Sequence, residues 1–146
     1  MKELTLLIPT KQEAESLPLV LEELKNFECK KLIVLDENDT ETMNSIEKFD
    51  CEILFQKNKG YGSALIEGIN KIETKYTCIF NADGSFDPKY LKQMLDECKL
   101  NLDFIFSSRY SKGGGTEDDT FLTFIGNKIF TTIGNIFFKL KIDDIL

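Results

Sequence analysis

The sequence contains no histidine and only one arginine, Arg109, among its 18 basic residues. Without histidine the chain has no Ser-His-Asp triad, no imidazole base and no His-bound zinc. Because arginine alone offers a planar fork of donors for phosphate or carboxylate groups, Arg109 is a candidate anion-binding residue. The alternative for Arg109 is an ordinary exposed surface residue.

Long apolar runs and regularly spaced cysteines are also missing. No stretch of about 18 uninterrupted apolar residues occurs, so we expect no membrane-spanning segment. The first residues lead directly into a strand pattern, so we expect no signal peptide. The four cysteines lack the spacing of metal or redox motifs and mostly lie in or beside apolar runs. This predicts reduced, structural thiols and a cytoplasmic location.

The charge balance is acidic, with a formal net charge of -7. No basic run is longer than two adjacent lysines, so a nucleic-acid partner is excluded. If the substrate carries phosphates, an acidic protein needs a divalent cation between its carboxylates and that substrate.

The length of 146 residues fits a single domain, and strand and helix patterns alternate along it. Short apolar runs predict strands at 4–8, 32–35, 51–55, 77–80 and 103–106. Helical spacing of apolar residues predicts helices at 13–26, 42–49, 63–72, about 88–100 and about 120–140. Such alternation predicts an α/β fold of three layers, with helices on both faces of a mostly parallel sheet.

Residues 77–88 are the stretch around which the rest is organised. An apolar strand pattern is followed by Asn81, Asp83, Ser85 and Asp87 at alternate positions. Pro88 then begins a helix pattern, with Asp87 as its predicted N-cap. Oxygen ligands therefore gather where a strand ends, which in open α/β sheets is the edge that binds ligands.

Polar clusters follow the other predicted strands in the same way. They are residues 9–13, 36–39, 58–62, 81–85 and 107–110. For each cluster alone a turn is the favoured interpretation, because Asp, Asn, Gly and Ser are common turn residues. Five clusters at the carboxyl ends of parallel strands favour one shared site instead.

These motifs, taken in order, resemble glycosyltransferase family 2. They read Pro-Thr-x-x-Glu, Asp-Glu after an apolar strand, Asn-x-Gly-x-Gly-x-Ala, Asn-Ala-Asp-Gly-Ser-x-Asp-Pro and Ser-Arg-Tyr-x-x-Gly-Gly. The likeness is strongest to dolichyl- or undecaprenyl-phosphate sugar synthases and covers nearly the whole chain. It implies a GT-A fold, a nucleotide-diphosphate-sugar donor, Mg²⁺ or Mn²⁺ as cofactor, and a lipid-phosphate acceptor. It also implies that residues 1–146 are one nucleotide-sugar-binding domain from the N-terminal part of a longer protein.

The resemblance assigns roles position by position. The residues matching nucleotide-sugar-binding positions are Pro9, Thr10, Glu13, Asp36, Glu37, Asn58, Gly60, Gly62, Asn81, Ala82 and Asp83. The metal-binding positions match Asn81, Asp83 and Ser85, and the catalytic positions match Asp83 and Arg109. Residues 113–115 match a flexible acceptor loop.

Two residues depart from the family pattern. Asn81 stands where a first Asp is usual, so one metal-binding carboxylate is missing, and Gln12 stands where Asn is usual before Glu13. Asn81 therefore keeps open a non-catalytic nucleotide-sugar-binding domain as the alternative to an enzyme. A nucleotidyltransferase is less favoured, because residues 9–13 do not form the Gly-rich basic loop that holds a triphosphate. A phosphate-binding P-loop motif is absent.

The last predicted helix, at about 120–140, carries apolar residues near helical spacing. Its cations are Lys128, Lys139 near its end and Lys141 just after it. One interpretation is an interfacial helix that brings the enzyme to a membrane surface and its lipid acceptor. The other is a helix packed on the sheet or on a further segment, with self-association through the 120–140 helix as a variant. The second interpretation is the preferred one.

Overall fold

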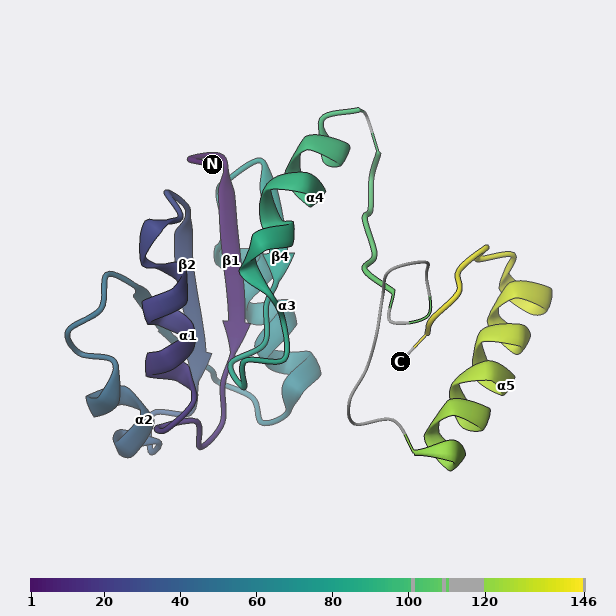
Figure 1. The fold of residues 1–146 in the computed structure, drawn as a ribbon. Coiled ribbons are helices and arrows are strands. Elements are labelled where there is room, and N and C mark those ends of the chain that lie inside the picture. Colours follow the sequence, from purple (N-terminus) through teal and green to yellow (C-terminus); the bar gives the residue numbers. More distant parts are fainter. Residues whose placement is uncertain (101, 109, 111–119, 146) are drawn as a thin grey trace. The chain divides into compact units, whose positions relative to one another are not determined.

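A computed structural model describes residues 1–100, 102–108, 110 and 120–145. It separates into two compact units, residues 1–103 and 104–146, and each is described by itself. Figure 1 shows the sheet and its helices in the first unit and a long helix in the second.

The first unit contains a four-stranded sheet whose strands are all parallel, in the order β3-β2-β1-β4. The strands are β1 (Leu4–Pro9), β2 (Lys30–Leu35), β3 (Glu52–Phe55) and β4 (Tyr76–Ile79). The helices are α1 (Leu17–Glu23), η1 (Leu24–Asn26), α2 (Thr40–Ser45), α3 (Tyr61–Lys71), η2 (Pro88–Tyr90) and α4 (Leu91–Cys98). The predicted α/β class is confirmed, because helices cover both faces of the parallel sheet (Figure 1).

Two apolar clusters lie on opposite faces of the sheet. Alternate residues of β1 and β2 belong to the larger cluster, with α1, α2 and α4 packed over it. The remaining alternate residues, among them Leu7 and Val34, belong to the smaller cluster with α3. At the closest approach the backbone of Gly68 on α3 lies against Leu7 and Val34, where no β-carbon fits. Apart from Thr5 and the two lysines that begin β2, the central strands are apolar, because both of their faces are buried.

The helices begin and end at slightly different residues from those predicted. Residues 11–16 form turns, so the first helix begins at Leu17 rather than at 13. The second begins two residues early, at Thr40, because the Asp39 side chain caps it by accepting the N–H of Thr42. Asp87 caps the η2 turn by accepting the N–H of Lys89, which confirms the predicted N-cap.

The prediction of a strand at 103–106 is wrong. The described residues of this segment pair with no strand, and Phe104 and Phe106 are 77% and 74% exposed. Their rings instead stack on each other, with centroids 6.1 Å apart. The short apolar run is typical of a strand, but strand formation depends on a partner edge and burial more than on intrinsic preference.

All four cysteines are free and half-buried, in agreement with the predicted structural thiols. Burial raises the pKa of the Cys78 thiol to about 11, so at neutral pH it stays protonated and a poor nucleophile.

The second unit is built on helix α5 (Phe121–Phe138), which begins with a capping box of Thr120 and Thr123. Its buried residues are polar or small, namely Asn127, Thr131 and Gly134, whereas its large apolar side chains are exposed. The C-terminal segment lies along the polar side. By length and composition alone α5 is long and apolar enough to cross a membrane, although polar residues interrupt its apolar sequence.

Candidate functional site at the carboxyl edge of the sheet

The four strands end at one edge of the sheet, here called the carboxyl edge, because all of them run in the same direction. Four of the five predicted polar clusters follow these strand ends and therefore meet at that edge. The fifth cluster follows the strand that does not form, and Arg109 and residues 113–115 lie outside the described residues. Their predicted roles stay predictions.

The loop after β1 is fixed against the second strand and the second helix. Thr10 is buried, and its N–H continues the strand pairing by donating to Val34 O at 2.8 Å. Its hydroxyl donates to Ile8 O at 3.1 Å. Glu13 is half-buried and accepts a hydrogen bond from the Ser16 hydroxyl. The loop thus presents Thr10 and Glu13 from a firmly held backbone.

The loop after β2 is a tight turn around Asp36. Asp36 Oδ1 accepts the backbone N–H of Asn38 at 2.9 Å and its side-chain amide at 2.7 Å. These hydrogen bonds lower the pKa of the Asp36 carboxyl below its ordinary value, so it is ionised at neutral pH. A fixed carboxylate of this kind accepts hydrogen bonds from a ribose or a base. Glu37 beside it is exposed.

The loop after β3 is held by a residue that the sequence patterns did not single out. Glu67 on α3 accepts the backbone N–H groups of Lys57 and Asn58, at 2.7 and 3.0 Å. Gly60, at φ 108°, then leads into the helix with a backbone that L side chains rarely adopt. No atom lies within 4 Å of a β-carbon built on Gly60 or Gly62, so this backbone leaves open space for a ligand.

The loop after β4 carries the predicted metal ligands. Ala82 is buried and anchors it, while Asp83 and Ser85 are exposed. Asp83 Oδ1 accepts the Ser85 N–H at 2.9 Å, and the Asn81 side-chain amide donates to the Ser85 hydroxyl at 3.0 Å. The other Asp83 oxygen and the Asn81 carbonyl oxygen have no protein partner among the described residues.

This donor set fits a hard cation that draws most of its ligands from a phosphate. Among the described residues no group of three His, Cys, Asp or Glu side chains could hold a metal by itself. Mg²⁺ is commonly bound by one or two carboxylates together with substrate phosphates and water. Asp83 offers one carboxylate oxygen, and Asn81 offers a neutral oxygen two positions earlier.

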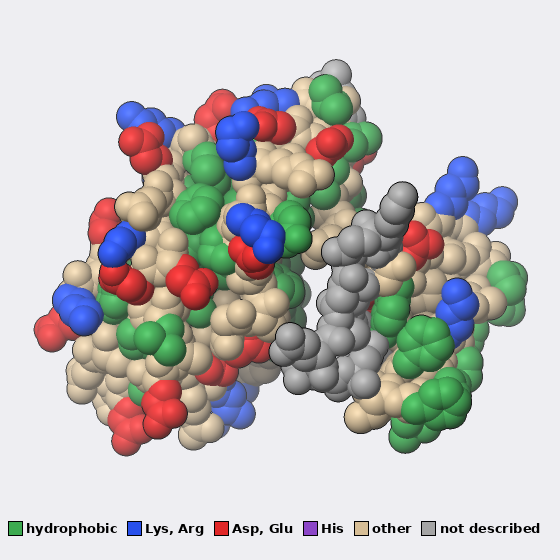
Figure 2. Space-filling model, in the orientation of Figure 1, with side chains coloured by type: hydrophobic (Ala, Val, Ile, Leu, Met, Phe, Trp, Pro, Cys, Tyr) green, Lys and Arg blue, Asp and Glu red, His purple; other side chains and the backbone are tan. Residues whose placement is uncertain are grey.

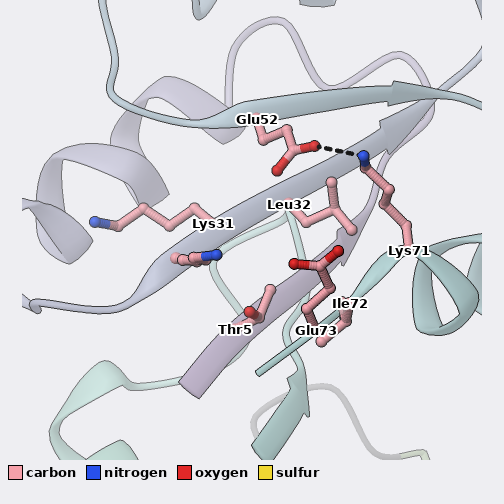
Figure 3. Close-up of a pocket in the computed structure, with 8 residues that line it drawn as sticks. Thr5, Lys31, Leu32, Glu52, Lys71, Ile72 and Glu73 are labelled. Carbon is pink, nitrogen blue, oxygen red and sulfur yellow. Dashed lines mark ion pairs between the residues drawn. The ribbon is translucent and has the colours of Figure 1, made fainter. Parts of the chain in front are cut away.

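A hollow lies at the opposite edge of the sheet, where the strands begin, here called the amino edge. It has a volume of about 90 Å³ and is lined by Thr5, Lys30, Lys31, Leu32, Glu52, Lys71, Ile72 and Glu73. Figure 3 shows the ion pair between Glu52 Oε1 and Lys71 Nζ, 3.5 Å apart, across this hollow. It lies where strands begin, far along the sheet from the predicted site residues.

The match to known families decides what kind of protein this is. Residues 5–145 match the model of glycosyl transferase family 2. The chain belongs to this family. The four-stranded parallel sheet agrees with the GT-A fold that the resemblance implied, and sugar transfer is the general activity of the family.

Three proteins similar to this chain are named as glycosyltransferases or as a mannosyltransferase. An uncharacterised glycosyltransferase of Mycobacterium tuberculosis is 28% identical over 111 residues, which cover 75% of this chain and 50% of the relative. The dolichol-phosphate mannosyltransferase of Pyrococcus furiosus is 25% identical over 141 residues, 90% of this chain and 40% of the relative. Glycosyltransferase AglJ of Haloferax volcanii is 25% identical over 108 residues, which cover 73% of this chain and 36% of the relative. The chain thus spans half or less of these relatives' length.

Proposed function

We propose that this chain is the donor-binding part of an inverting glycosyltransferase that uses a nucleotide-diphosphate sugar. The observation that carries the proposal is the meeting of four polar loops at the carboxyl edge of the sheet. Within them, Asp36 is held ionised, the Gly60–Gly62 backbone is open, and Asp83 keeps a carboxylate oxygen available. Family membership supports transfer of a sugar in general.

Each loop has a distinct role in this proposal. The loop after β1, with Pro9, Thr10 and Glu13, and the Asp36 turn hold the nucleoside, and the loop after β3 flanks it. Asp83, assisted by Asn81 and Ser85, holds Mg²⁺ or Mn²⁺ on the donor diphosphate. When bound, the ion offsets the negative charge that grows on the departing nucleoside diphosphate.

The acceptor we propose is a polyprenyl phosphate. Its phosphate oxygen attacks the anomeric carbon in line, the bond to the diphosphate breaks, and its electron pair leaves with the nucleoside diphosphate. Because that oxygen is already anionic, the step needs no strong general base, which suits a chain without histidine. The Pyrococcus relative, named a dolichol-phosphate mannosyltransferase, supports a lipid phosphate of this class.

Helix α5 supports a location at the cytoplasmic membrane surface. Its exposed residues include Phe121, Leu122, Ile129, Phe130, Ile133, Ile136, Phe137 and Phe138, each at least 42% exposed. Lys128 is the one charged residue of the helix, and Lys139 and Lys141 lie just beyond its C-terminal end. Acidic residues precede the helix in the sequence at 117–119, and Asp143 and Asp144 follow the lysines. Figure 2 shows apolar side chains spread over this helix. An exposed apolar helix with a lysine on it and two more at its C-terminal end matches an element that lies in the interface of a bilayer.

Donor binding is tested by thermal unfolding with UDP-sugars and GDP-sugars, each with and without Mn²⁺. We expect one nucleotide class to raise the melting temperature, more so with Mn²⁺, and Asp83→Asn to abolish the Mn²⁺-dependent part. No shift with any nucleotide sugar would overturn the donor-site proposal.

Membrane contact is tested by co-sedimentation with vesicles of anionic or zwitterionic lipid. We expect binding to the anionic vesicles, and we expect Ile136→Glu with Phe137→Glu to remove it. Leu19→Glu, at a 68% exposed position of α1, is the matched control and should bind normally. Self-association measured without lipid, together with no vesicle binding, would favour an oligomer contact instead.

A second candidate function is donor binding without catalysis, which the missing carboxylate at Asn81 favours. Hydrolysis of the nucleotide sugar by wild type and by Asn81→Asp separates the two. Binding without hydrolysis in either form supports the non-catalytic domain, whereas hydrolysis that rises in Asn81→Asp supports an enzyme.

A further inference from the structure

One carboxylate joins the first two loops of the carboxyl edge, although 27 residues separate them in sequence. Asp39 Oδ1 accepts the N–H of Thr42 at 3.3 Å and caps helix α2. Asp39 Oδ2 accepts the N–H of Gln12, in the loop after β1, at 2.7 Å. The same side chain therefore begins a helix and holds the neighbouring loop.

The loop position that Asp39 holds is conformationally unfavourable. Gln12 has φ 58°, in the left-handed region that glycine and asparagine adopt more readily than glutamine. A residue in this region persists only when its surroundings determine the conformation. The short bond from the Gln12 N–H to the Asp39 side chain is such a determinant, because hydrogen bonds to carboxylates are stronger than those between neutral groups.

A second contact holds the next residue of the same loop. The Glu13 N–H donates to Thr42 Oγ1 at 3.0 Å, and Thr42 is completely buried. Two successive N–H groups of the loop are thus bound by the first turn of α2, and that turn directly follows Asp36. The Asp39 N–H in turn donates to Asp36 O at 3.0 Å.

We propose that Asp39 is a positioning residue for the nucleotide. It locks the loop that presents Thr10 and Glu13 onto the turn that presents Asp36, so that the two loops act as one preorganised surface. The proposal rests on the proposed donor-binding function, which places the nucleoside at these two loops. Asp39 itself acts through the backbone of Gln12 and makes no contact with the donor.

The substitution Asp39→Asn leaves one side-chain oxygen for two N–H groups, because the amide nitrogen that replaces the other oxygen donates hydrogen bonds and cannot accept them. Asn is as good an N-cap as Asp, so when its oxygen keeps the bond to Thr42, the Gln12 N–H loses its acceptor. Amide exchange at Thr42, compared with exchange at Gln12, shows which of the two N–H groups has lost its acceptor. Asp50→Asn is the matched control, because Asp50 is exposed, lies five residues after the end of α2, and makes no hydrogen bond or ion pair within the part of the chain that the structure describes.

The experiment measures binding of UDP and of GDP, with Mn²⁺, by calorimetry for wild type, Asp39→Asn and Asp50→Asn. For the nucleotide that wild type binds, we expect Asp39→Asn to weaken binding about tenfold, as for loss of one charged hydrogen bond. Asp50→Asn should change binding by less than about twofold, as for an exposed charge. Adding Gln12→Gly to Asp39→Asn should restore much of the affinity, because glycine adopts positive φ without the clamp.

Amide hydrogen exchange of the free protein tests the clamp without any nucleotide. We expect faster exchange at Gln12 and Glu13 in Asp39→Asn, with unchanged exchange in β1 and β2. Unchanged exchange at Gln12, or equal nucleotide binding by wild type and Asp39→Asn, would overturn the positioning role. Loss of protection throughout the sheet would also overturn it, since the effect would then be one of folding. Failure of wild type to bind either nucleotide overturns the donor-binding function itself, and the exchange result still decides whether Asp39 holds the loop.

Discussion

Glu67 Oε1 accepts the backbone N–H of Asn58 at 3.0 Å, so helix α3 holds the loop that precedes it. The second Glu67 oxygen accepts the N–H of Lys57. Hydrogen bonds from these two N–H groups lower the pKa of the Glu67 carboxyl below its ordinary value. Like Asp39, Glu67 is a carboxylate on one helix that fixes a loop at the carboxyl edge.

We expect the loop after β3 to loosen in acid. A carboxylate whose pKa is lowered in the folded state stabilises the structure above its ordinary pKa and stops doing so once it is protonated. The hydrogen bonds from the loop to the Glu67 carboxylate should therefore stabilise the loop fully at neutral pH, and this stabilisation should be lost below about pH 4. Amide exchange at Lys57 and Asn58, corrected for intrinsic rates, measures it. Glu67→Gln should loosen the loop at all pH values, whereas Glu47→Gln, at an exposed position, should not.

Replacing Gly68 should destabilise the first unit. A β-carbon at Gly68 would lie 2.3 Å from Leu7 Cδ1, and Leu7 is completely buried and cannot swing aside. We expect Gly68→Ala to lower the free energy of unfolding by about 1–3 kcal/mol through overpacking. Gly62→Ala in the same helix has open space around it and should be neutral or stabilising by up to about 1 kcal/mol. Urea denaturation of the two variants makes the comparison, and equal stability would contradict the close approach.

Replacing Gln12 by asparagine should stabilise the protein. Gln12 has positive φ, and asparagine tolerates this conformation better than glutamine does. We expect Gln12→Asn to increase the free energy of unfolding by up to about 1 kcal/mol. Gln56→Asn, at a position without positive φ, is the control. A lower melting temperature for Gln12→Asn than for wild type would contradict the strained backbone.

Asn127 should be essential to the second unit. It is 2% exposed, donates to Asp144 Oδ1 at 2.7 Å and accepts the N–H of Ile145 at 3.1 Å. Removing it leaves buried polar groups unpaired, at a cost of about 1–3 kcal/mol. We expect Asn127→Ala to speed amide exchange at Ile145, whereas Asn70→Ala on α3 should leave it unchanged.

The sequence predicts the parallel sheet well because β1 and β2 are mostly buried on both faces and therefore mostly apolar, with Thr5 and the two lysines that begin β2 as the exceptions. It also predicts that Asp36 and Asp83 share one edge, since all parallel strands end together. The strand predicted at 103–106 could not be excluded from the sequence, because Phe104, Ile105 and Phe106 form a short apolar run like those of the real strands.

The contacts that hold the loops were beyond sequence reasoning. Asp39 followed by Thr42 has the spacing of an N-cap and its third helical residue, and this signal was available for α2. No local pattern shows that the same residues bind the N–H groups of Gln12 and Glu13, because these partners are distant in sequence. In the sequence Glu67 is likewise an ordinary acidic residue of an amphipathic helix. Only the structure shows that it binds the N–H group of Asn58.

The central claim is that the donor nucleotide binds at the carboxyl edge of the sheet. Amide exchange by mass spectrometry, with and without saturating UDP or GDP plus Mn²⁺, tests it most directly. We expect protection in residues 10–13, 36–39, 57–62 and 81–85, and none around the hollow at the amino edge shown in Figure 3. Protection at Lys30, Lys31 and Lys71 instead, with the four loops unchanged, would contradict the account.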